Sequence, residues 1–261
     1  MRLSVSNVLE SMRSHESRDH SLAEHCAALL LVGGLGTRLS PVFAAGPKCM
    51  APVGGRPFLE YLLLALRSWG FSEVILAVGY KASAIESHYG TGDGLGMEIR
   101  YSMESESLGT AGALKNAEPL LPHEHLLVVN GDSFLEVDLH AMFRFHREQD
   151  ALATIGLKAA ADPSRYGSVL LDSQSRIVAF REKAPAAANS NPLINGGIYL
   201  FQREILNRIP SGRPVSLERE TLPSLVGKGM LGFVTHGFFI DIGTPEDYER
   251  VQADFPMRLS L

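Results

Sequence analysis

The sequence predicts an α/β protein with a doubly wound sheet of mixed strand direction. In its first half, short apolar runs at residues 27–32, 74–78 and 126–129 alternate with stretches of helical periodicity. Continuous apolar runs of this length are typical of strands that are covered on both faces. Strands that alternate with helices predict right-handed crossovers, with helices on both faces of a largely parallel sheet.

The other elements of the first half are expected in the following order. A helix is expected over residues 56–70, because proline stands near its first turn, glycine just past its end, and leucines recur at helical spacing. After it we expect a strand at 74–78, a helix at 81–89, a strand at 97–101, a helix at 110–120, a strand at 126–129 and a helix at 137–149.

In the second half, short polar turns separate the expected strands. Strands are expected at 151–158, 168–171, 176–180 and 193–201, and short helices at 202–209 and 217–226. At 244–247, threonine, proline and two acidic residues form the start signal of a further helix. We therefore expect a smaller mixed-sheet lobe beside the first half, with no linker between them.

The composition excludes several classes of protein. The 261 residues are 45% hydrophobic and 20% charged, as in ordinary globular proteins. The net charge of −5 argues against a nucleic-acid partner, and no apolar run approaches the about 18 residues of a membrane span. Residues 1–25 lack the apolar core of a signal peptide and are interpreted as a partly ordered leader. Cys26 and Cys49 have no disulfide-framework spacing, which favours free thiols and a cytoplasmic location.

A glycine-rich loop directly follows the first apolar run and predicts a phosphate cradle. Its three glycines are Gly33, Gly34 and Gly36. Because glycine lacks a Cβ, such a loop turns tightly and brings backbone N–H groups close to an anion. Thr37 and Arg38 follow at once, and Lys48 adds a second cation ten residues later. The spacing fits neither a P-loop, G-x-x-x-x-G-K-[ST], nor the dinucleotide fingerprint G-x-G-x-x-G.

The string G-G-x-G-T-R, followed by P-K and M-A-P-V, resembles the signature of the sugar-1-phosphate nucleotidyltransferases, also called nucleotide-sugar pyrophosphorylases. The resemblance covers roughly residues 27–251. It implies transfer of a nucleoside monophosphate from a nucleoside triphosphate to a sugar 1-phosphate, with release of pyrophosphate. It also implies a Rossmann-like nucleotide-diphospho-sugar transferase fold. The expected division is a leader at 1–25 and one domain at 26–255, made of a nucleotide-binding lobe at 26–150, a sugar-phosphate lobe at 151–235, and a second metal motif with a closing helix at 236–255.

Two aspartates are the candidate metal ligands. Asp132 follows a buried strand, and ligands of open α/β sheets gather at the carboxyl ends of strands; the alternative is a simple turn. Asp241 stands in an apolar run, where an unpaired charge is costly. Both positions match metal motifs of the family, so the resemblance implies Mg²⁺ held by these two carboxylates. Together with Arg38 and Lys48, they are the expected catalytic residues.

The resemblance places the sugar-phosphate contacts in the second half. The candidates are Gly167, Glu182, Lys183, Asn195 and Gly196. In the family, the glutamate of an E-K-P segment contacts a sugar hydroxyl and its lysine holds the sugar phosphate, roles that pass to Glu182 and Lys183. Without the resemblance, this charged pair fits an exposed strand end better. The glycines that interrupt the strand at 193–201 indicate close approach of a ligand to the backbone.

Selection of the base is expected in the loop at residues 104–112. The candidate nucleotide contacts there are Glu104, Glu106, Gly109 and Thr110. Guanine presents two adjacent donors, N1–H and the 2-amino group, which suit a carboxylate acceptor, whereas uracil and thymine suit an amide. Either glutamate therefore favours GTP, although a solvated side chain is the alternative for both.

Within the family, the strings R-P-F-L-E-Y, S-L-E-R-E-T-L-P and F-F-I-D-I-G-T-P-E-D-Y look most like the D-glycero-α-D-manno-heptose 1-phosphate guanylyltransferases. Those enzymes make GDP-heptose for surface glycans such as capsule and lipopolysaccharide. The alternatives are a mannose-1-phosphate guanylyltransferase, a pyrophosphorylase that uses UTP or dTTP, and a non-catalytic nucleotide-sugar sensor. No nucleic-acid or membrane partner is expected, and a homo-oligomer stays open.

Overall fold

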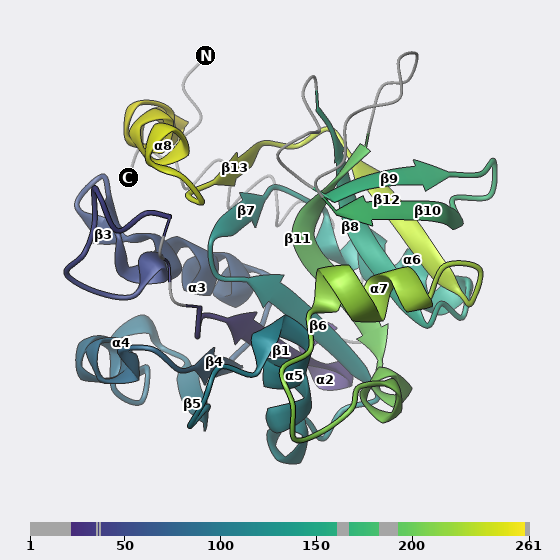
Figure 1. The fold of residues 1–261 in the computed structure, drawn as a ribbon, viewed down its shortest axis with the longest axis horizontal. Helices are drawn as coiled ribbons and strands as arrows, with labels where there is room; N and C mark the ends of the chain where they lie inside the picture. Colours follow the sequence, from purple (N-terminus) through teal and green to yellow (C-terminus); the bar gives the residue numbers. More distant parts are fainter. Residues whose placement is uncertain (1–21, 35, 37, 161–166, 183–192, 259–261) are drawn as a thin grey trace.

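The computed structural model describes residues 22–34, 36, 38–160, 167–182 and 193–258, and one nine-stranded sheet runs through it (Figure 1). The strands are β1 (Cys26–Leu31), β4 (Glu73–Val78), β5 (Glu98–Met103), β6 (His125–Asn130), β8 (Ala153–Ala159), β9 (Gly167–Leu171), β10 (Ile177–Glu182), β11 (Leu193–Gln202) and β12 (Met230–Thr235). The main path is β10-β9-β11-β6-β1-β4-β5, while β8 pairs with β11 and β12 with β8. β1, β4, β5 and β6 are parallel to one another, whereas β11 is antiparallel to β6. The predicted mixed α/β sheet is confirmed.

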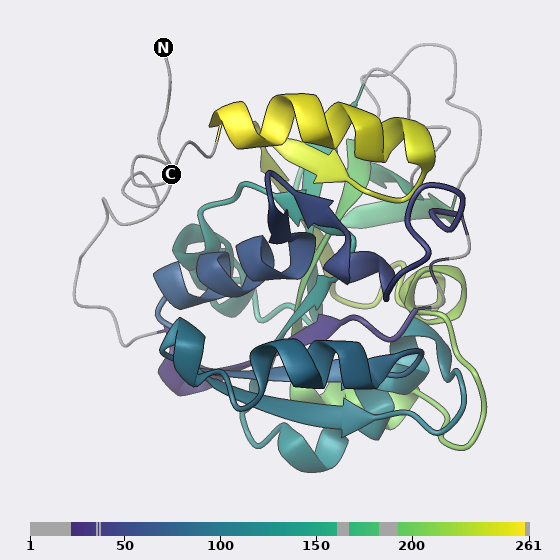
Figure 2. The ribbon, with the colours of Figure 1, turned by 90° about the vertical axis from the view of Figure 1, so that its left-hand side faces the viewer.

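Helices cover both faces of this sheet. The helices are α3 (Phe58–Ser68), α4 (Ala82–Tyr89) and α6 (Leu139–Glu148) on one face, and α5 (Gly109–Asn116) and α7 (Leu222–Ser224) on the other. Figure 2 shows α3 and α4 in front of the sheet. Successive residues of β1 point to opposite faces, so Ala28 and Leu30 join the first core and Ala27 and Leu29 the second. A strand buried on both sides must be apolar throughout, as the sequence of β1 is.

A small ribbon beside the main sheet joins two distant parts of the chain. β7 (Ser133–Leu135) follows β6 and pairs in antiparallel register with β13 (Phe239–Asp241). A second ribbon is formed by β2 (Pro52–Val53) and β3 (Arg56–Pro57). After β13, α8 (Pro245–Arg258) begins at the predicted signal, where the Thr244 hydroxyl accepts the N–H of Asp247 at 3.2 Å.

The helix expected over 56–70 is shorter than predicted, because Arg56 and Pro57 pair within β3. Its predicted end at Gly70 is confirmed by a left-handed φ of 94°, which glycine adopts without strain. Of the two short helices expected in the second half, the first is a 3₁₀ segment (Arg203–Arg208), and the second starts as a π-helix (Leu217–Thr221).

The sequence did not predict strand β12, because Gly229 and Gly232 interrupt its apolar pattern. Gly232 is nevertheless a strand residue, since a Cβ at this position would collide with Leu157 and Leu171. Of the predicted leader, residues 1–21 lie outside the described residues, and Leu22–His25 form the short helix α2. No helix in the described ranges is long and apolar enough to cross a membrane. Both cysteines are buried free thiols, as predicted.

Two histidines pack in the core near the amino end of β6. His146 of α6 is fully buried, its Nδ1 lies 2.9 Å from the Thr154 hydroxyl, and its ring lies edge-on to His125 with centroids 5.3 Å apart. Burial and the neighbouring His125 lower the pKa of His146 to about 3. The folded protein therefore holds His146 neutral at a pH where the unfolded chain would protonate it.

This burial predicts an acid-dependent loss of stability. A histidine whose pKa is lowered by folding contributes stability that is complete above about pH 6.5 and declines as the pH falls toward 3. Between pH 7 and pH 5, the free energy of unfolding should fall by about 2 kcal/mol more in the wild type than in His146→Asn. Urea titrations of both proteins at several pH values measure the difference. Parallel pH profiles would contradict the assignment.

Candidate active site

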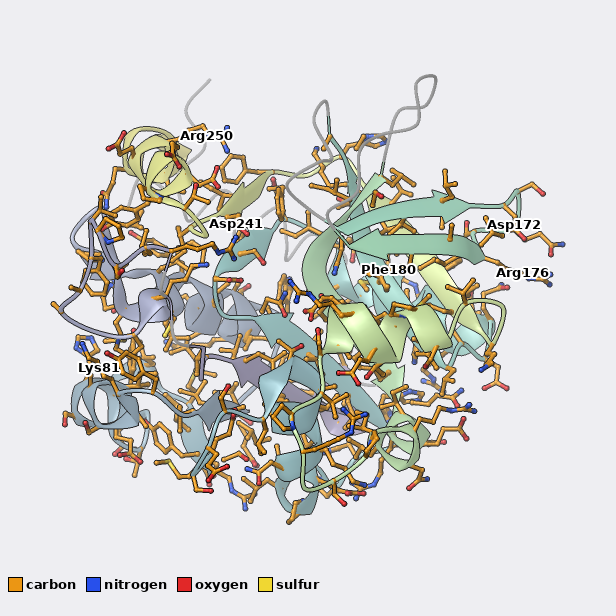
Figure 3. The ribbon with its side chains drawn as sticks, viewed as in Figure 1. Lys81, Asp172, Arg176, Phe180, Asp241 and Arg250 are labelled. Atoms are coloured by element: carbon orange, nitrogen blue, oxygen red, sulfur yellow. The ribbon has the colours of Figure 1, made fainter. Side chains whose placement is uncertain are left out.

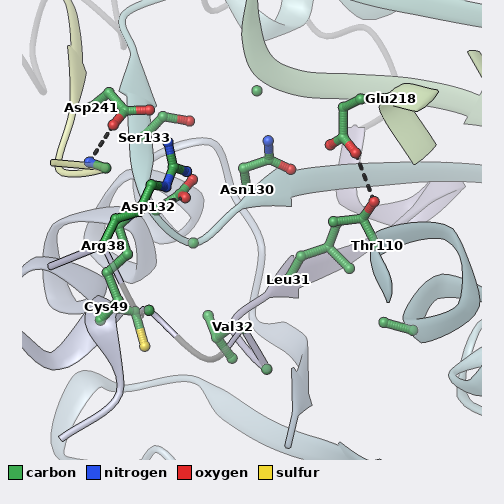
Figure 4. A pocket seen from close by; sticks show the side chains of 18 of the residues that line it. Leu31, Val32, Arg38, Cys49, Thr110, Asn130, Asp132, Ser133, Glu218 and Asp241 are labelled. Atoms are coloured by element: carbon green, nitrogen blue, oxygen red, sulfur yellow. Dashed lines mark hydrogen bonds and ion pairs between the residues drawn. The ribbon is translucent and has the colours of Figure 1, made fainter. Parts of the chain in front are cut away.

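A cavity of about 650 Å³ opens at the carboxyl ends of β1 and β6, where Leu31 and Asn130 pair in register (Figure 4). Figure 3 shows Asp241 pointing toward the centre of the molecule, whereas Asp172 and Arg176 lie at the outer tip of the β9–β10 hairpin. The predicted site residues in the cavity wall are Gly33, Gly34, Gly36, Arg38, Lys48, Glu104, Gly109, Thr110, Asp132, Gly167, Asn195 and Asp241. Side chains from across the sequence thus meet at one edge of the sheet.

The remaining predicted residues are placed differently. Glu106 is exposed and does not line this cavity. Gly196 is buried against Leu135, and its neighbour Gly197 lines the cavity instead. The backbone of Glu182 ends β10 opposite Gly167, but its side chain is outside the described set. Thr37 and Lys183 also lie outside the described residues.

The glycine-rich loop is held close to two other segments. Gly36 has a φ of 62°, and a Cβ on it would lie 2.9 Å from the Cβ of Lys48. A Cβ on Gly33 would lie 2.9 Å from Oε1 of Glu104. At Gly36 the left-handed φ also favours glycine, and a Cβ on Gly33 would lie 3.1 Å from the backbone N of Gly79, so a side chain at either position would force its neighbours to shift. The loop therefore lies against both a cationic residue and the predicted base-recognition segment.

Lys48 and Asp132 form an ion pair, with Nζ 2.8 Å from Oδ2. The lysine side chain is 11% exposed and that of the aspartate 39%, so water screens the pair only in part. Burial raises the pKa of Asp132, but the charges of Lys48 and Arg38 outweigh it and hold this pKa below its usual value. Asp132 is therefore a stable carboxylate.

Asp241 is brought to the same place by the β7–β13 ribbon, in which it pairs with Ser133. Burial and the charge of Asp132 raise the pKa of Asp241 to about 6, although Lys48 and the N–H donated by Gly243 oppose the shift. Two carboxylates thus share one partly buried site, and the single positive charge of Lys48 does not neutralise both. A divalent cation with hard oxygen ligands fits this donor set.

The described residues contain no group of three or more His, Cys, Asp or Glu side chains arranged to hold a metal ion. A cation at the two aspartates would therefore take its further ligands from water or from substrate phosphates, as Mg²⁺ commonly does. This arrangement is open, because the cavity continues past both carboxylates.

The predicted base-recognition loop is fixed from two sides. Oε2 of Glu104 accepts the N–H of Leu108 at 2.9 Å, and burial raises the pKa of Glu104 despite that bond. Gly109 has a φ of 69°, and a Cβ there would lie 2.6 Å from the carbonyl oxygen of Val215. The same carbonyl accepts the N–H groups of Ala111 and Gly112, so these first donors of α5 are already used.

Sequence reasoning missed several residues of the wall. They are Ser107, Asn130, Ser133, Glu218, Gly243, Thr244 and Asp247. Glu218 stands in the S-L-E-R-E-T-L-P string, which served only to mark family likeness, and a carboxylate in that string was an available signal. The Thr110 hydroxyl, predicted to contact nucleotide, donates to Glu218 at 2.8 Å and accepts the N–H of Leu217 at 2.7 Å.

The fold and the cavity define a class: an α/β enzyme that joins a glycine-rich loop, two cations and two carboxylates at the carboxyl edge of its sheet. The chain matches the nucleotidyl transferase family over residues 27–257 and belongs to that family. This match confirms the resemblance to the sugar-1-phosphate nucleotidyltransferases.

Curated relatives of the chain carry two kinds of guanylyltransferase name. It is 40% identical over 230 residues to a mannose-1-phosphate guanylyltransferase of Mycobacterium tuberculosis. The aligned region covers 87% of this chain but only 64% of that protein. It is 39% identical over 228 residues to a D-glycero-alpha-D-manno-heptose 1-phosphate guanylyltransferase of Aneurinibacillus thermoaerophilus, with 87% and 97% covered.

Solved structures show the same fold. The crystal structure of HddC from Yersinia pseudotuberculosis is similar with a TM-score of 0.76 and 32% identity, covering 88% of this chain and 99% of that one. HddC has also been crystallised with GMP-PN, and that structure has a TM-score of 0.75 to this chain.

The crowding of two carboxylates predicts that Asp241→Asn stabilises the metal-free protein. Because folding raises the pKa of Asp241, its ionised form destabilises the fold above about pH 6, and this penalty disappears as the pH falls toward 4. At pH 7, the free energy of unfolding should rise by about 3 kcal/mol in the variant. Thermal or urea unfolding in a chelator measures it, with pH 4 as the internal control. An equal stabilisation at both pH values would contradict this cause.

Proposed function

We propose that this protein transfers GMP from GTP to a sugar 1-phosphate and releases pyrophosphate. The proposal rests on one observation: the Lys48–Asp132 ion pair meets Asp241 beside Arg38 in the cavity that the glycine-rich loop borders. Such a set can position two phosphate-bearing reactants and neutralise their charge. The names of the relatives, guanylyltransferases for heptose or mannose 1-phosphate, support the same reaction.

The reaction needs no general base, because the attacking phosphate oxygen of the sugar 1-phosphate is already an anion. Catalysis then consists of in-line positioning at the α-phosphorus and of charge neutralisation. In this proposal Arg38 binds the leaving pyrophosphate, and Lys48 neutralises the charge that develops at the α-phosphate. Lys183, which lies outside the described residues, would hold the attacking phosphate.

Asp132 and Asp241 would hold Mg²⁺ in the substrate complex. Bound there, the ion would neutralise the phosphate oxygens and hold both reactants in register. The donor set supports this proposal, because both groups are hard oxygen ligands and Asp241 lies where a positive charge is favoured.

Glu104 is the proposed guanine-recognition residue. Its Oε2 is held by the N–H of Leu108, and the carboxylate lines the cavity beside the glycine-rich loop. A fixed carboxylate suits the adjacent N1–H and 2-amino donors of guanine. Glu106, the other candidate, is exposed away from the wall. The GMP-PN complex of HddC supports a guanine nucleotide.

For the sugar, heptose 1-phosphate is favoured over mannose 1-phosphate. The strings R-P-F-L-E-Y and S-L-E-R-E-T-L-P resemble those of the heptose enzymes, and two relatives named heptose 1-phosphate guanylyltransferase are 39% and 38% identical to this chain. The mycobacterial mannose enzyme, at 40% identity, keeps mannose 1-phosphate as the alternative. The product, GDP-heptose, would supply surface glycans such as capsule or lipopolysaccharide from the cytoplasm. The two buried free thiols fit that reducing compartment.

The first test is pyrophosphate release with Mg²⁺ across GTP, ATP, UTP, CTP and dTTP, each with heptose, mannose and glucose 1-phosphates. Turnover is expected with GTP and the heptose phosphate. Asp132→Asn should lower kcat by at least about 100-fold while thermal unfolding stays cooperative, since the change removes a charge and keeps the shape. A near-normal rate in that variant would exclude the proposed role of Asp132. Nucleotide binding without any turnover would instead point to a sensor.

Glu104→Gln should reduce kcat/KM for GTP by about 100-fold. The amide can keep the hydrogen bond from Leu108 only with its oxygen, so its NH₂ would face the two donors of guanine. The relative rate with UTP should rise in the same assay. Glu106→Gln is the matched control, since that carboxylate is exposed and outside the wall. Equal losses in both variants would contradict the assignment of Glu104.

A further inference from the structure

Glu218 is a carboxylate of the cavity wall to which the proposed reaction gives no role. It belongs to the π-helix Leu217–Thr221, a form that is common at functional sites. Its Oε2 accepts hydrogen bonds from the hydroxyls of Thr110 at 2.8 Å and Ser216 at 3.2 Å. Its Oε1 has no hydrogen bond or ion pair with any described residue. Figure 4 shows the carboxyl group on the wall opposite Asp132 and Asp241.

The structural role of Glu218 does not require its charge. The segment before it is already joined to the base loop by backbone bonds, from Val215 N to Leu108 O at 2.8 Å and from Ala111 N to Val215 O at 3.0 Å. One neutral acceptor would satisfy both hydroxyls that donate to Oε2. An unpaired carboxylate in a cavity that binds phosphates repels them, so the second oxygen requires a different explanation.

Neutral polar side chains lie in the same cavity wall as Glu218, or are hydrogen-bonded to that wall. Tyr199 is fully buried, and burial, followed by the charge of Glu218, raises its pKa far above the usual value. The Tyr199 hydroxyl accepts from Nδ2 of Asn195 at 2.7 Å. Oδ1 of Asn130, also in the wall, is buried without a hydrogen-bond partner among the described residues.

These acceptors form a surface that suits O–H donors. An ionised carboxylate accepts hydrogen bonds only, and its bonds with hydroxyl donors are short and strong. The orphan amide oxygen of Asn130 provides a second acceptor in the cavity wall. Figure 4 shows Arg38, Asp132 and Asp241 across the cavity from Glu218, so phosphates and hydroxyl-bearing rings would bind at different ends.

We propose that Oε1 of Glu218 accepts a hydrogen bond from a ring hydroxyl of the substrate sugar and thereby determines sugar specificity. The inference rests on the proposed function, because it requires a sugar phosphate in the cavity. The ring is assigned to the sugar 1-phosphate, because the same cavity wall contains Gly167 and Asn195, the predicted sugar-phosphate contacts. The ribose of the nucleotide carries the same chemistry and is distinguished by the test.

The test variant is Glu218→Gln. Thr110 and Ser216 donate to the side chain, so the amide oxygen should stay with them and the NH₂ group should replace Oε1 in the cavity. The KM for the sugar 1-phosphate should rise about tenfold, while the KM for GTP changes less than twofold. Glu218→Asp, which withdraws the carboxylate, should raise the same KM.

A double-mutant cycle, in which one change is made in the enzyme and the other in the substrate, then identifies the substrate hydroxyl that Glu218 contacts. Wild type and Glu218→Gln are assayed with monodeoxy sugar 1-phosphates and with 2′-deoxy- and 3′-deoxy-GTP. For one deoxy sugar, the wild type should lose about tenfold in kcat/KM and the variant almost nothing. Coupling with a deoxy-GTP instead would assign the contact to ribose and overturn the sugar assignment. Additive losses for every analogue would overturn the contact altogether.

Two controls separate this role from a structural one. Glu220→Gln changes an exposed carboxylate of the same helix, which pairs with Arg213 at 2.9 Å, and should leave all these constants unchanged. Ser216→Ala removes one of the two hydroxyls that donate to Oε2 but keeps the cavity carboxylate, so it should keep the wild-type discrimination against the deoxy sugar. If it loses that discrimination, Glu218 acts only by holding the loop. Failure of wild-type turnover with every substrate pair would refute the proposed function itself.

Discussion

The charge cluster of Lys48, Asp132 and Asp241 is the constraint on which the rest of the site depends. Asp132 is stabilised as a carboxylate by Lys48, while Asp241 is destabilised by burial and by Asp132. Two carboxylates approach each other in this way only where the surrounding structure forces them together. The forcing element is the β7–β13 ribbon, whose register places Asp241 opposite Ser133 and thus one residue from Asp132.

The closing helix ties that ribbon to the first half of the chain. The Tyr248 hydroxyl donates to the carbonyl oxygen of Pro52 at 2.5 Å, and the Gln252 side chain donates to the same atom. Pro52 follows Lys48 by one short turn, so α8 connects the segment of Asp241 to the segment of the cavity lysine. The helix that starts after Gly243 therefore fixes the position of Asp241 relative to the segment of Lys48.

Local sequence signals predicted most of the helices and strands. Contacts between distant parts of the chain limited how much of the site could be predicted. Apolar runs predicted β1, β4 and β6, because a strand that is buried on both faces must be apolar at nearly every position. The choice between Glu104 and Glu106 stayed open in the sequence, since only the approach of the Leu108 N–H and the glycine-rich loop separates them. Glu218 and the β7–β13 pairing depend on contacts more than 100 residues apart, which no local pattern reports.

The balance of charge in the cavity wall also favours a bound cation. The described wall residues include five carboxylates, of which Asp247 is paired with Arg250 at 2.8 Å, and only two cations, Arg38 and Lys48. A cavity with an excess of negative charge would repel a triphosphate and a sugar phosphate unless positive charge entered with them. A nucleotide that arrives with its divalent ion would supply that charge, and the paired aspartates are placed to receive it. The same excess means that a carboxylate oxygen engaged neither by the ion nor by a protein donor, such as Oε1 of Glu218, must be matched by a donor on the substrate.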